Sequence, residues 1–219
     1  MVLILLAAGQ SRRFGENKLF HKIGSCPIYR HVLEIYDHVA GIEKKIIVSA
    51  YDQILEEAKE FGYICIKNQR SELGISHSIR LGMREACRHS CKDLLFAVCD
   101  QPFLKPESVN ALIAGYYASG KSLAGIGCGE DIGNPCIFNI QWANSLLRLR
   151  KDRGGKEILL ANPNLLYRLE GVDPCQLRDI DRPEDLIAPK QKQEDEKREA
   201  WREMEAEHER TDRDLEERA

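Results

Sequence analysis

The sequence lacks a long uninterrupted apolar segment. A membrane-spanning helix needs about 20 predominantly apolar residues, and no run in this chain approaches that length. The first apolar run, residues 2–6, passes directly into a glycine-containing loop, whereas a secretory leader has a longer apolar stretch and a cleavage site. We therefore expect a cytoplasmic protein without membrane association.

The chain also lacks a strong excess of charge of either sign. Its formal net charge is −3, with 32 Lys and Arg against 35 Asp and Glu. Residues 190–219 hold 8 of the basic and 12 of the acidic side chains, which leaves an almost neutral body of 24 against 23. Such a body has no basic field for nonspecific binding of nucleic acid. We expect no nucleic-acid partner, and any anion site has to be local.

The 8 cysteines form neither a disulfide framework nor a zinc-binding pattern. Without a secretory leader, we expect the thiols to stay reduced. Cys87 and Cys91 have a spacing that a helix can use for a metal, but no second Cys/His pair follows at a zinc-like interval. The cysteines that lie in apolar runs are expected to pack as small hydrophobes: Cys65, Cys99, Cys128 and Cys136.

Two common phosphate-binding motifs are absent after the first apolar run. The chain has no G-x-x-x-x-G-K-[ST] and no G-x-G-x-x-G there, which argues against Walker-type ATPases and ordinary dinucleotide-binding dehydrogenases. Residues 6–18 instead combine small residues around Gly9 with Arg12, Arg13 and Lys18. Small residues let backbone amides approach a polyphosphate, and the cations neutralise its charge. We predict a loop for a nucleoside triphosphate; a plain turn with solvated basic residues is the alternative.

Short apolar or β-branched runs alternate with helix-like stretches over the first 118 residues. The expected strands are residues 2–6, 45–49, 63–67 and 94–99, and the expected helices are residues 28–39, 53–61, 76–89 and 106–118. This alternation is typical of βαβ units. We predict one α/β domain over residues 1–189, a Rossmann-like, mostly parallel sheet with helices on both faces. Ligands of such sheets bind at the carboxyl ends of the strands.

The pattern changes after an expected strand at residues 123–128. Residues 125–133 are rich in glycine, and a short strand at 136–139 and helices near 142–149 and 156–161 follow, which together suggest an insertion closing over the sheet edge. Further short strands are expected at 165–170 and 178–180, and a last short helix begins at Pro183. Residues 190–219 are about two-thirds charged and cannot form a core. We expect a helical or mobile tail there, or a helix that binds a partner.

Asp100 closes the apolar run 94–99 and is the strongest single candidate for a metal ligand. Mg²⁺ prefers one or two carboxylates together with substrate phosphates, and Pro102 stiffens the turn that follows the acid. Asp181, after the last expected strand, is the candidate second ligand. The competing interpretation of Asp100 is a turn-forming aspartate.

Three further segments carry polar groups suited to substrates. Residues 74–82 begin a helix whose free N–H groups, with Ser76 and Ser78, can bind a base or a phosphate, although Ser76 is equally suited to capping the helix. Residues 133–138 and 151–157 are polar loops where we expect a second, acceptor substrate. The acceptor-binding candidates are Asn134, Pro135, Asp152 and Lys156.

Five segments in this order resemble the molybdenum cofactor cytidylyltransferase family, within the wider group of MobA-like NTP transferases. They are residues 6–19, 74–82, 99–103, 133–138 and 179–186. The first also matches the nucleotidyltransferase signature L-x-A-G-x-x-x-R-x-G-x-x-K. In this group L-A-A-G accompanies CTP and L-A-G-G accompanies GTP, so Ala8 implies CTP. The chain departs from the family pattern G-D-x-G-x-R, because Lys151 and Lys156 replace its first glycine and its arginine, and lysine lacks the bidentate contacts of a guanidinium.

The resemblance implies Mg²⁺-dependent transfer of CMP from CTP to the terminal phosphate of molybdenum-bound molybdopterin, with release of pyrophosphate. Arg13 would stabilise the departing pyrophosphate, Lys18 would offset charge at the α-phosphate, and Asp100 with Asp181 would hold the metal. A molybdenum hydroxylase would receive the product. The implied nucleotide-binding residues are Leu6, Ala7, Ala8, Gly9, Arg13, Lys18, Ser76 and Ser78.

Two alternatives remain open at this point. One keeps the fold and the chemistry but changes the substrates, to a guanylyltransferase or a transferase that acts on sugar or alcohol phosphates. The other is a non-catalytic chaperone that binds molybdenum cofactor and docks through its charged tail.

Overall fold

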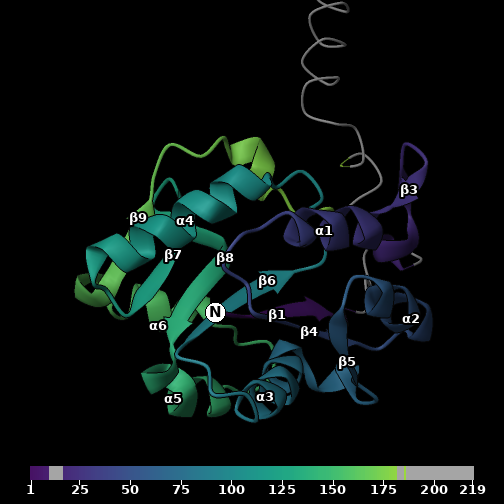
Figure 1. The fold of residues 1–219 in the computed structure, drawn as a ribbon, viewed down its shortest axis with the longest axis horizontal. Coiled ribbons are helices and arrows are strands. Elements are labelled where there is room, and N and C mark those ends of the chain that lie inside the picture. Colours follow the sequence, from purple (N-terminus) through teal and green to yellow (C-terminus); the bar gives the residue numbers. More distant parts are fainter. Residues whose placement is uncertain (10–16, 182–184, 186–219) are drawn as a thin grey trace, which may run out of the picture. The chain divides into compact units, whose positions relative to one another are not determined.

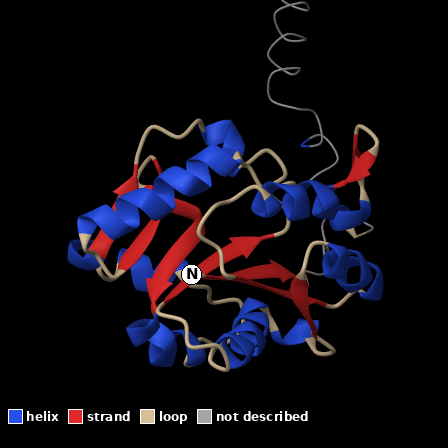
Figure 2. Cartoon of the chain, viewed as in Figure 1, coloured by secondary structure: helices blue, strands red, loops and turns tan. Residues whose placement is uncertain are grey.

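A central sheet organises the chain in the computed structural model, which describes residues 1–9, 17–181 and 185. Its seven strands have the order β5-β4-β1-β6-β8-β7-β9, and a separate hairpin pairs β2 with β3. Figure 2 shows the sheet passing between two layers of helices. The strands are β1 (Val2–Ala7), β2 (Lys22–Ile23), β3 (Cys26–Pro27), β4 (Lys44–Ser49), β5 (Tyr63–Lys67), β6 (Asp93–Val98), β7 (Leu123–Cys128), β8 (Asp131–Asn139) and β9 (Leu166–Leu169).

The strand β1 lies in the middle of the parallel part of the sheet. It pairs with β4 on one side and β6 on the other, so that Leu5 lies opposite Ile47 and Ala97. β5 continues the parallel order beyond β4. Apart from the half-buried Leu6, every residue of β1 is buried, as expected for an apolar run covered on both faces. The predicted α/β fold with a mostly parallel sheet is confirmed.

The helices cover both faces of the sheet (Figure 1). α1 (Ile28–Asp37) and α4 (Pro106–Ser119) lie on one face, and α3 (Ile75–Ala86) and α5 (Ala143–Leu147) lie on the other. α2 (Asp52–Glu60) packs against β5 and β4, and α6 (Lys156–Leu160) packs against β8 and β7. Short 3₁₀ turns complete the chain: η1 (Lys18–Phe20), η2 (Ser71–Leu73), η3 (Ile140–Trp142), η4 (Pro163–Leu165) and η5 (Pro174–Leu177).

A close approach between α3 and β1 fixes the helix over the sheet. A Cβ atom on Gly82 would lie 2.5 Å from Cγ2 of Ile4, so only glycine lets the helix come this near. Ile4 and Met83 are fully buried in the same core. The start of α3 is thereby held beside the carboxyl end of β1, where the sheet is expected to bind ligands.

The glycine-rich region after β7 does not form an insertion over the sheet edge, contrary to expectation. β8 is a nine-residue strand that lies between β6 and β7 and runs antiparallel to both. Sequence patterns place only 136–139 in a strand, because Gly133 and Pro135 disfavour strand interiors. Gly125 pairs with Cys136 and Ile126 with Gly133, and the register shift between these pairs leaves Asn134 and Pro135 outside the pairing with β7.

The predicted strand at residues 178–180 is also wrong. These residues form no ladder with the sheet; instead the backbone N–H of Ile180 donates to the carbonyl oxygen of Asp100 at 3.0 Å. Residues 1–183 form one compact unit. The helix predicted to begin at Pro183 and the tail predicted at 190–219 lie outside the described residues.

The cysteines of the described chain are free thiols. Cys99 and Cys136 are buried, as their apolar neighbours predict, and Cys65 is half-buried. The side chain of Cys128 is outside the described set. No described helix is both long and apolar enough to cross a membrane.

A buried carboxylate ties α4 to the strands at the edge of the sheet where β6 begins. Asp93 accepts hydrogen bonds at Oδ1 from the hydroxyl of Tyr116, at 2.6 Å, and from Nδ2 of Asn139, at 3.0 Å. Tyr117 donates to Oδ2 at 3.4 Å. Since Asp93 is 8% exposed, these donors replace the water that a carboxylate would otherwise bind.

We predict that Asp93→Ala lowers the free energy of unfolding by about 2–3 kcal/mol, because it leaves the buried Tyr116 hydroxyl and the half-buried Asn139 amide without their acceptor. Urea denaturation measures the loss. Asp52→Ala is the control, because the Asp52 side chain is 82% exposed and pairs with Lys67 only at the surface; its cost is about 0.5 kcal/mol or less. Equal losses in the two variants would contradict a structural role for the buried network.

Candidate active site

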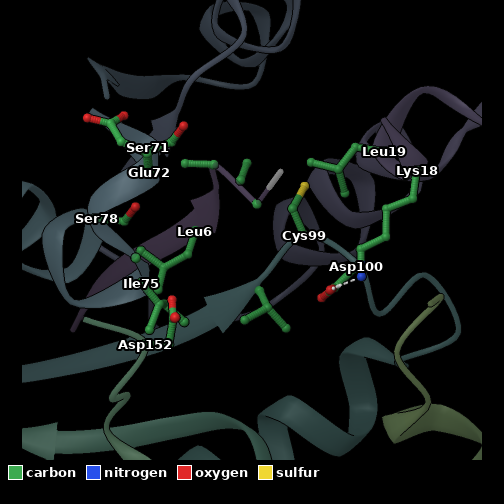
Figure 3. A pocket seen from close by; sticks show the side chains of 15 residues that line it. Leu6, Lys18, Leu19, Ser71, Glu72, Ile75, Ser78, Cys99, Asp100 and Asp152 are labelled. Carbon is green, nitrogen blue, oxygen red and sulfur yellow. Dashed lines mark ion pairs between the residues drawn. The ribbon is translucent and has the colours of Figure 1, made fainter. Parts of the chain in front are cut away.

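A cavity of about 390 Å³ opens at the carboxyl ends of β1 and β6. Figure 3 shows Lys18 and Asp100 on one side of it and Ser78, Ile75 and Asp152 on the other. The wall therefore combines the loop after β1, the turn after β6, the start of α3 and the segment before α6. Its lining residues are Leu6, Ala7, Ala8, Gly9, Lys18, Leu19, Ser71, Glu72, Gly74, Ile75, Ser78, Val98, Cys99, Asp100 and Asp152.

Small residues after β1 give the cavity an open backbone wall. A Cβ atom on Gly9 would meet no atom of the described residues within 4 Å, and this backbone lines the cavity. The carbonyl of Ala7 accepts a hydrogen bond from the Ser49 hydroxyl at 3.0 Å, and the carbonyl of Gly9 accepts one from the Tyr51 hydroxyl at 2.9 Å. These bonds hold the start of the loop. Arg12 and Arg13 fall in residues 10–16, outside the described chain.

Lys18 connects two acids, one that follows β6 and one near the end of the domain. Its Nζ lies 2.7 Å from Oδ2 of Asp100 and 2.9 Å from Oδ1 of Asp181. Asn17 caps the short turn that carries Lys18, accepting a hydrogen bond from the N–H of Leu19. Burial lowers the pKa of Lys18, but the charges and hydrogen bonds of the two acids outweigh burial and raise it above its usual value. Lys18 is therefore a fixed cation.

The acids around Lys18 create a strongly negative site. Partial burial, together with the charge of Asp100, raises the pKa of Asp179 to about 6, although part of the Asp179 residue stays open to solvent. Oδ1 of Asp100 is buried and has no hydrogen-bond partner in the described structure. A buried carboxylate oxygen without a donor is costly unless a ligand satisfies it. The site is thus suited to a further cation.

The donor set fits Mg²⁺ that is shared with a substrate. Asp100 and Asp181 both reach the Lys18 ammonium group, so their carboxylates converge on one region. No cluster of three or more His, Cys, Asp or Glu in the described chain forms a closed metal cage. Mg²⁺ commonly uses one or two carboxylates and takes its other ligands from water and phosphates. The residues present suit that mode of binding.

Gln101 is a site residue that sequence reasoning missed. Its buried side chain donates from Nε2 to the carbonyl of Leu177, at 3.0 Å, and to Oδ1 of Asp179, at 2.9 Å. With the bond between Ile180 and Asp100, this holds residues 177–181 against the turn after β6. The sequence shows Gln101 only as a polar residue directly after Asp100. Its role was not predicted because its hydrogen-bond partners lie 76 and 78 residues away along the chain.

The start of α3 places the two predicted serines differently. Ser78 lines the cavity, and its hydroxyl is held by Nδ2 of the buried Asn68 at 2.9 Å. Ser76 is fully buried and does not line the cavity. Its backbone N–H donates to the carbonyl of Lys151 at 3.1 Å, and its side chain does not cap the helix. Asn68, which positions Ser78, was not predicted.

A second cavity, of about 200 Å³, brings together three of the four acceptor candidates. Asn134, Asp152 and Lys156 line it over an apolar floor that includes Phe96 and Phe138. Pro135 is buried beside it without lining it. Both cavities share four residues of wall, so they adjoin: Leu6, Ile75, Val98 and Asp152.

The sheet is mostly parallel, and a loop of small residues, a fixed cation and an acid that follows β6 surround one cavity at its strand ends. This arrangement is typical of α/β proteins, whose ligands bind at the carboxyl ends of the strands. Within this class the chain belongs to the family described as MobA-like NTP transferase domain, which matches residues 3–165. It is accordingly a nucleotidyltransferase.

Curated relatives support this placement. Purine catabolism protein PucB of Bacillus subtilis is 27% identical over 197 residues, which cover 84% of this chain and 93% of PucB. A probable molybdenum cofactor guanylyltransferase of Pyrococcus horikoshii is 29% identical over 121 residues, 55% of this chain and 59% of that protein. A solved structure, the homologue of Mycobacterium tuberculosis rv0371c from Mycobacterium sp. strain JC1, shares the fold with a TM-score of 0.71 and 23% identity, covering 84% of this chain and 91% of that one.

Gly74 provides a test of how the cavity wall is held. Its φ of +83° and ψ of 176° are open to glycine alone, and a Cβ would lie 2.5 Å from Oδ1 of Asp152 and 2.6 Å from the backbone of Lys151. We predict that Gly74→Ala lowers the free energy of unfolding by about 2–4 kcal/mol through strain and overpacking.

Gly62→Ala is the matched control for this substitution, since Gly62 has a φ of +75° and nothing within 4 Å of its Cβ position. It isolates the backbone strain, about 1–2 kcal/mol. Urea denaturation compares the two variants. Equal losses would show that Gly74 does not hold the 151–152 segment by close contact.

Proposed function

We propose that this nucleotidyltransferase moves CMP from CTP to the terminal phosphate of molybdenum-bound molybdopterin in a Mg²⁺-dependent reaction. The observation that carries the proposal is the Lys18–Asp100 ion pair at the ends of neighbouring strands, beside an open backbone wall of small residues. An anionic donor needs this combination, because amides and a cation bind its phosphates while a carboxylate recruits the metal.

The transfer needs positioning and charge compensation more than covalent help. A phosphate oxygen of the acceptor forms a bond to the α-phosphorus of CTP, the bond between the α-phosphorus and the bridging oxygen breaks, and pyrophosphate leaves with that electron pair. Backbone amides after β1 bind the β and γ phosphates. Lys18 offsets charge that develops at the α-phosphate, and Arg13 does so at the leaving pyrophosphate.

Asp100 and Asp181 are the residues that would hold Mg²⁺. The ion, when bound, neutralises phosphate charge and polarises the phosphoryl group. The chain's own contribution is the arrangement of the acids: Gln101 and the Ile180–Asp100 hydrogen bond keep residues 179–181 beside Asp100.

The choice of CTP as the nucleotide substrate rests on Ala8. This residue makes the L-A-A-G segment similar to that of family members that use CTP. Ala8 lines the first cavity, at the ends of β1 and β6, which we call the donor cavity because it would hold the nucleotide. Ala8 is 7% exposed, so its methyl group can affect which nucleotide fits. GTP is the second candidate, because the Pyrococcus horikoshii relative carries the name of a guanylyltransferase.

The acceptor choice is supported by the same relative's name and by the second cavity. Its apolar floor and polar rim suit a ring system that bears hydrogen-bonding groups and a phosphate. Because the two cavities share a wall at Asp152, a phosphate in the second cavity can approach a nucleotide in the first.

The test is pyrophosphate release from each of the four NTPs with molybdenum-bound molybdopterin, and with sugar phosphates as competing acceptors. We expect CTP with the molybdenum cofactor to give the highest kcat/KM. Preference for GTP would show that the protein is a guanylyltransferase. Robust turnover of a sugar phosphate would contradict the proposed acceptor.

We predict that Asp100→Asn lowers kcat/KM by about 100-fold or more, because charge compensation in the transition state is lost. Asp37→Asn is the matched control: Asp37 forms a similar pair with Lys45, at 2.6 Å, away from the cavity lining. It should keep activity within about twofold. An Asp100→Asn variant that keeps its kcat/KM would contradict the role given to this carboxylate. A variant that loses turnover but keeps its biological activity would favour the non-catalytic chaperone.

A further inference from the structure

A cluster of cations lies where α3 meets the segment that follows α5, outside the lining of both cavities. Residues 148–153 read Arg-Leu-Arg-Lys-Asp-Arg, with one acid among four basic side chains. Arg80 and Arg84, one helical turn apart on α3, add two more. Figure 1 shows α3 and α5 side by side on the same face of the sheet, and the two helices are in contact. The almost neutral body of the chain thus carries a local concentration of positive charge.

Two guanidinium groups of this cluster converge on one backbone oxygen. Nη1 of Arg80 donates to the carbonyl of Leu149 at 2.7 Å, and Nη1 of Arg150 donates to the same carbonyl at 3.0 Å. A neutral carbonyl cannot compensate two full positive charges. Burial, followed by the charges of Arg150 and Arg84, lowers the pKa of Arg80. Arg80 is therefore close enough to both Arg150 and Arg84 to be repelled by each of them.

The nearby acids are committed elsewhere. Glu85, next to Arg84 in sequence, pairs with Arg88 at 2.7 Å and contacts His89 at 3.3 Å. The carboxylate of Asp152 lies at Gly74 and lines the cavities. Within the described chain, Arg80, Arg84 and Arg150 have no acidic partner, although Arg84 and Arg150 are exposed to solvent.

We propose that Arg80, Arg84 and Arg150 form a binding site for a phosphate-class oxyanion, either free phosphate or a phosphate ester. Each guanidinium offers five N–H donors in a planar fork that matches phosphate oxygens, and most of these donors are unused here. A bound oxyanion relieves the repulsion between the arginines. A bound oxyanion also restrains Leu149, which lies three residues before Asp152. Because Asp152 lines both cavities, the anion site adjoins the catalytic region without belonging to it.

NMR titration of the full chain tests the site directly. The arginine Nε–Hε signals, assigned with the Arg84→Gln and Arg150→Gln variants, report this cluster separately from any phosphate bound in the donor cavity. One titration uses inorganic phosphate and the other uses glycerol 3-phosphate. The ligand that binds more tightly shows whether the site takes free phosphate or a phosphate ester. We expect saturable shifts of these signals and at least tenfold weaker binding in the double variant.

Arg88→Gln is the matched control, because Arg88 lies on the same stretch of chain but already pairs with Glu85. Its affinity for the anion should stay within about twofold of the unsubstituted protein. Signals that do not respond to either anion, or a double variant that binds as tightly as the unsubstituted chain, would overturn the proposal.

Thermal unfolding gives an independent readout that does not need an assignment. In buffer free of phosphate and sulfate, Arg84→Gln should raise the Tm, because it removes the repulsion between this solvent-exposed side chain and Arg80. Addition of phosphate should then raise the Tm of the unsubstituted chain more than that of Arg84→Gln. A lower Tm for Arg84→Gln without anion would contradict the repulsion on which the site depends.

Discussion

The position of one ammonium group, that of Lys18, determines how the active site is assembled. It meets Asp100 at the end of β6 and Asp181 from the end of the domain, so three segments distant in sequence converge on a single cation. Without this cation, Asp100, Asp179 and Asp181 would repel one another across a partly buried space, where burial first and the charge of Asp100 second already raise the pKa of Asp179. An ion pair in such a setting fixes geometry more than it adds stability.

The sheet topology explains why this convergence is possible. The parallel strands β1 and β6 are neighbours, so their carboxyl ends, and the loops that follow them, meet at one edge. α3 is held against β1 by the close contact at Gly82, which places Ile75 and Ser78 across the cavity from Lys18. The antiparallel β8 then brings Asn134 beside the same edge and forms part of the second cavity.

Much of the fold and the core of the site could be predicted from sequence, because strong local patterns encode them. The apolar runs that became β1, β4, β5 and β6 were predicted within one residue at each end, and Lys18 and Asp100 followed from their places after two of those strands. β8 was predicted only in its second half, because Gly133 and Pro135 are ordinarily signs of a loop. Its pairing depends on neighbouring strands that no local pattern reveals.

The residues that were missed act through contacts that only the folded chain brings together. Gln101 holds Leu177 and Asp179, and Asn68 holds Ser78, so neither role can be read from spacing along the chain. Arg80 reaches across 69 residues to the Leu149 carbonyl, to which Arg150 also donates, and only the packing of α3 against the segment after α5 makes this contact possible.

A crystal structure with a non-hydrolysable CTP analogue and Mg²⁺ tests the central claim most directly. The account predicts the triphosphate in the cavity between the loop after β1 and Asp100, with its phosphates on the backbone of residues 7–9 and near Lys18, and the metal on Asp100. A nucleotide bound outside this cavity, or a metal that does not contact Asp100, would contradict it.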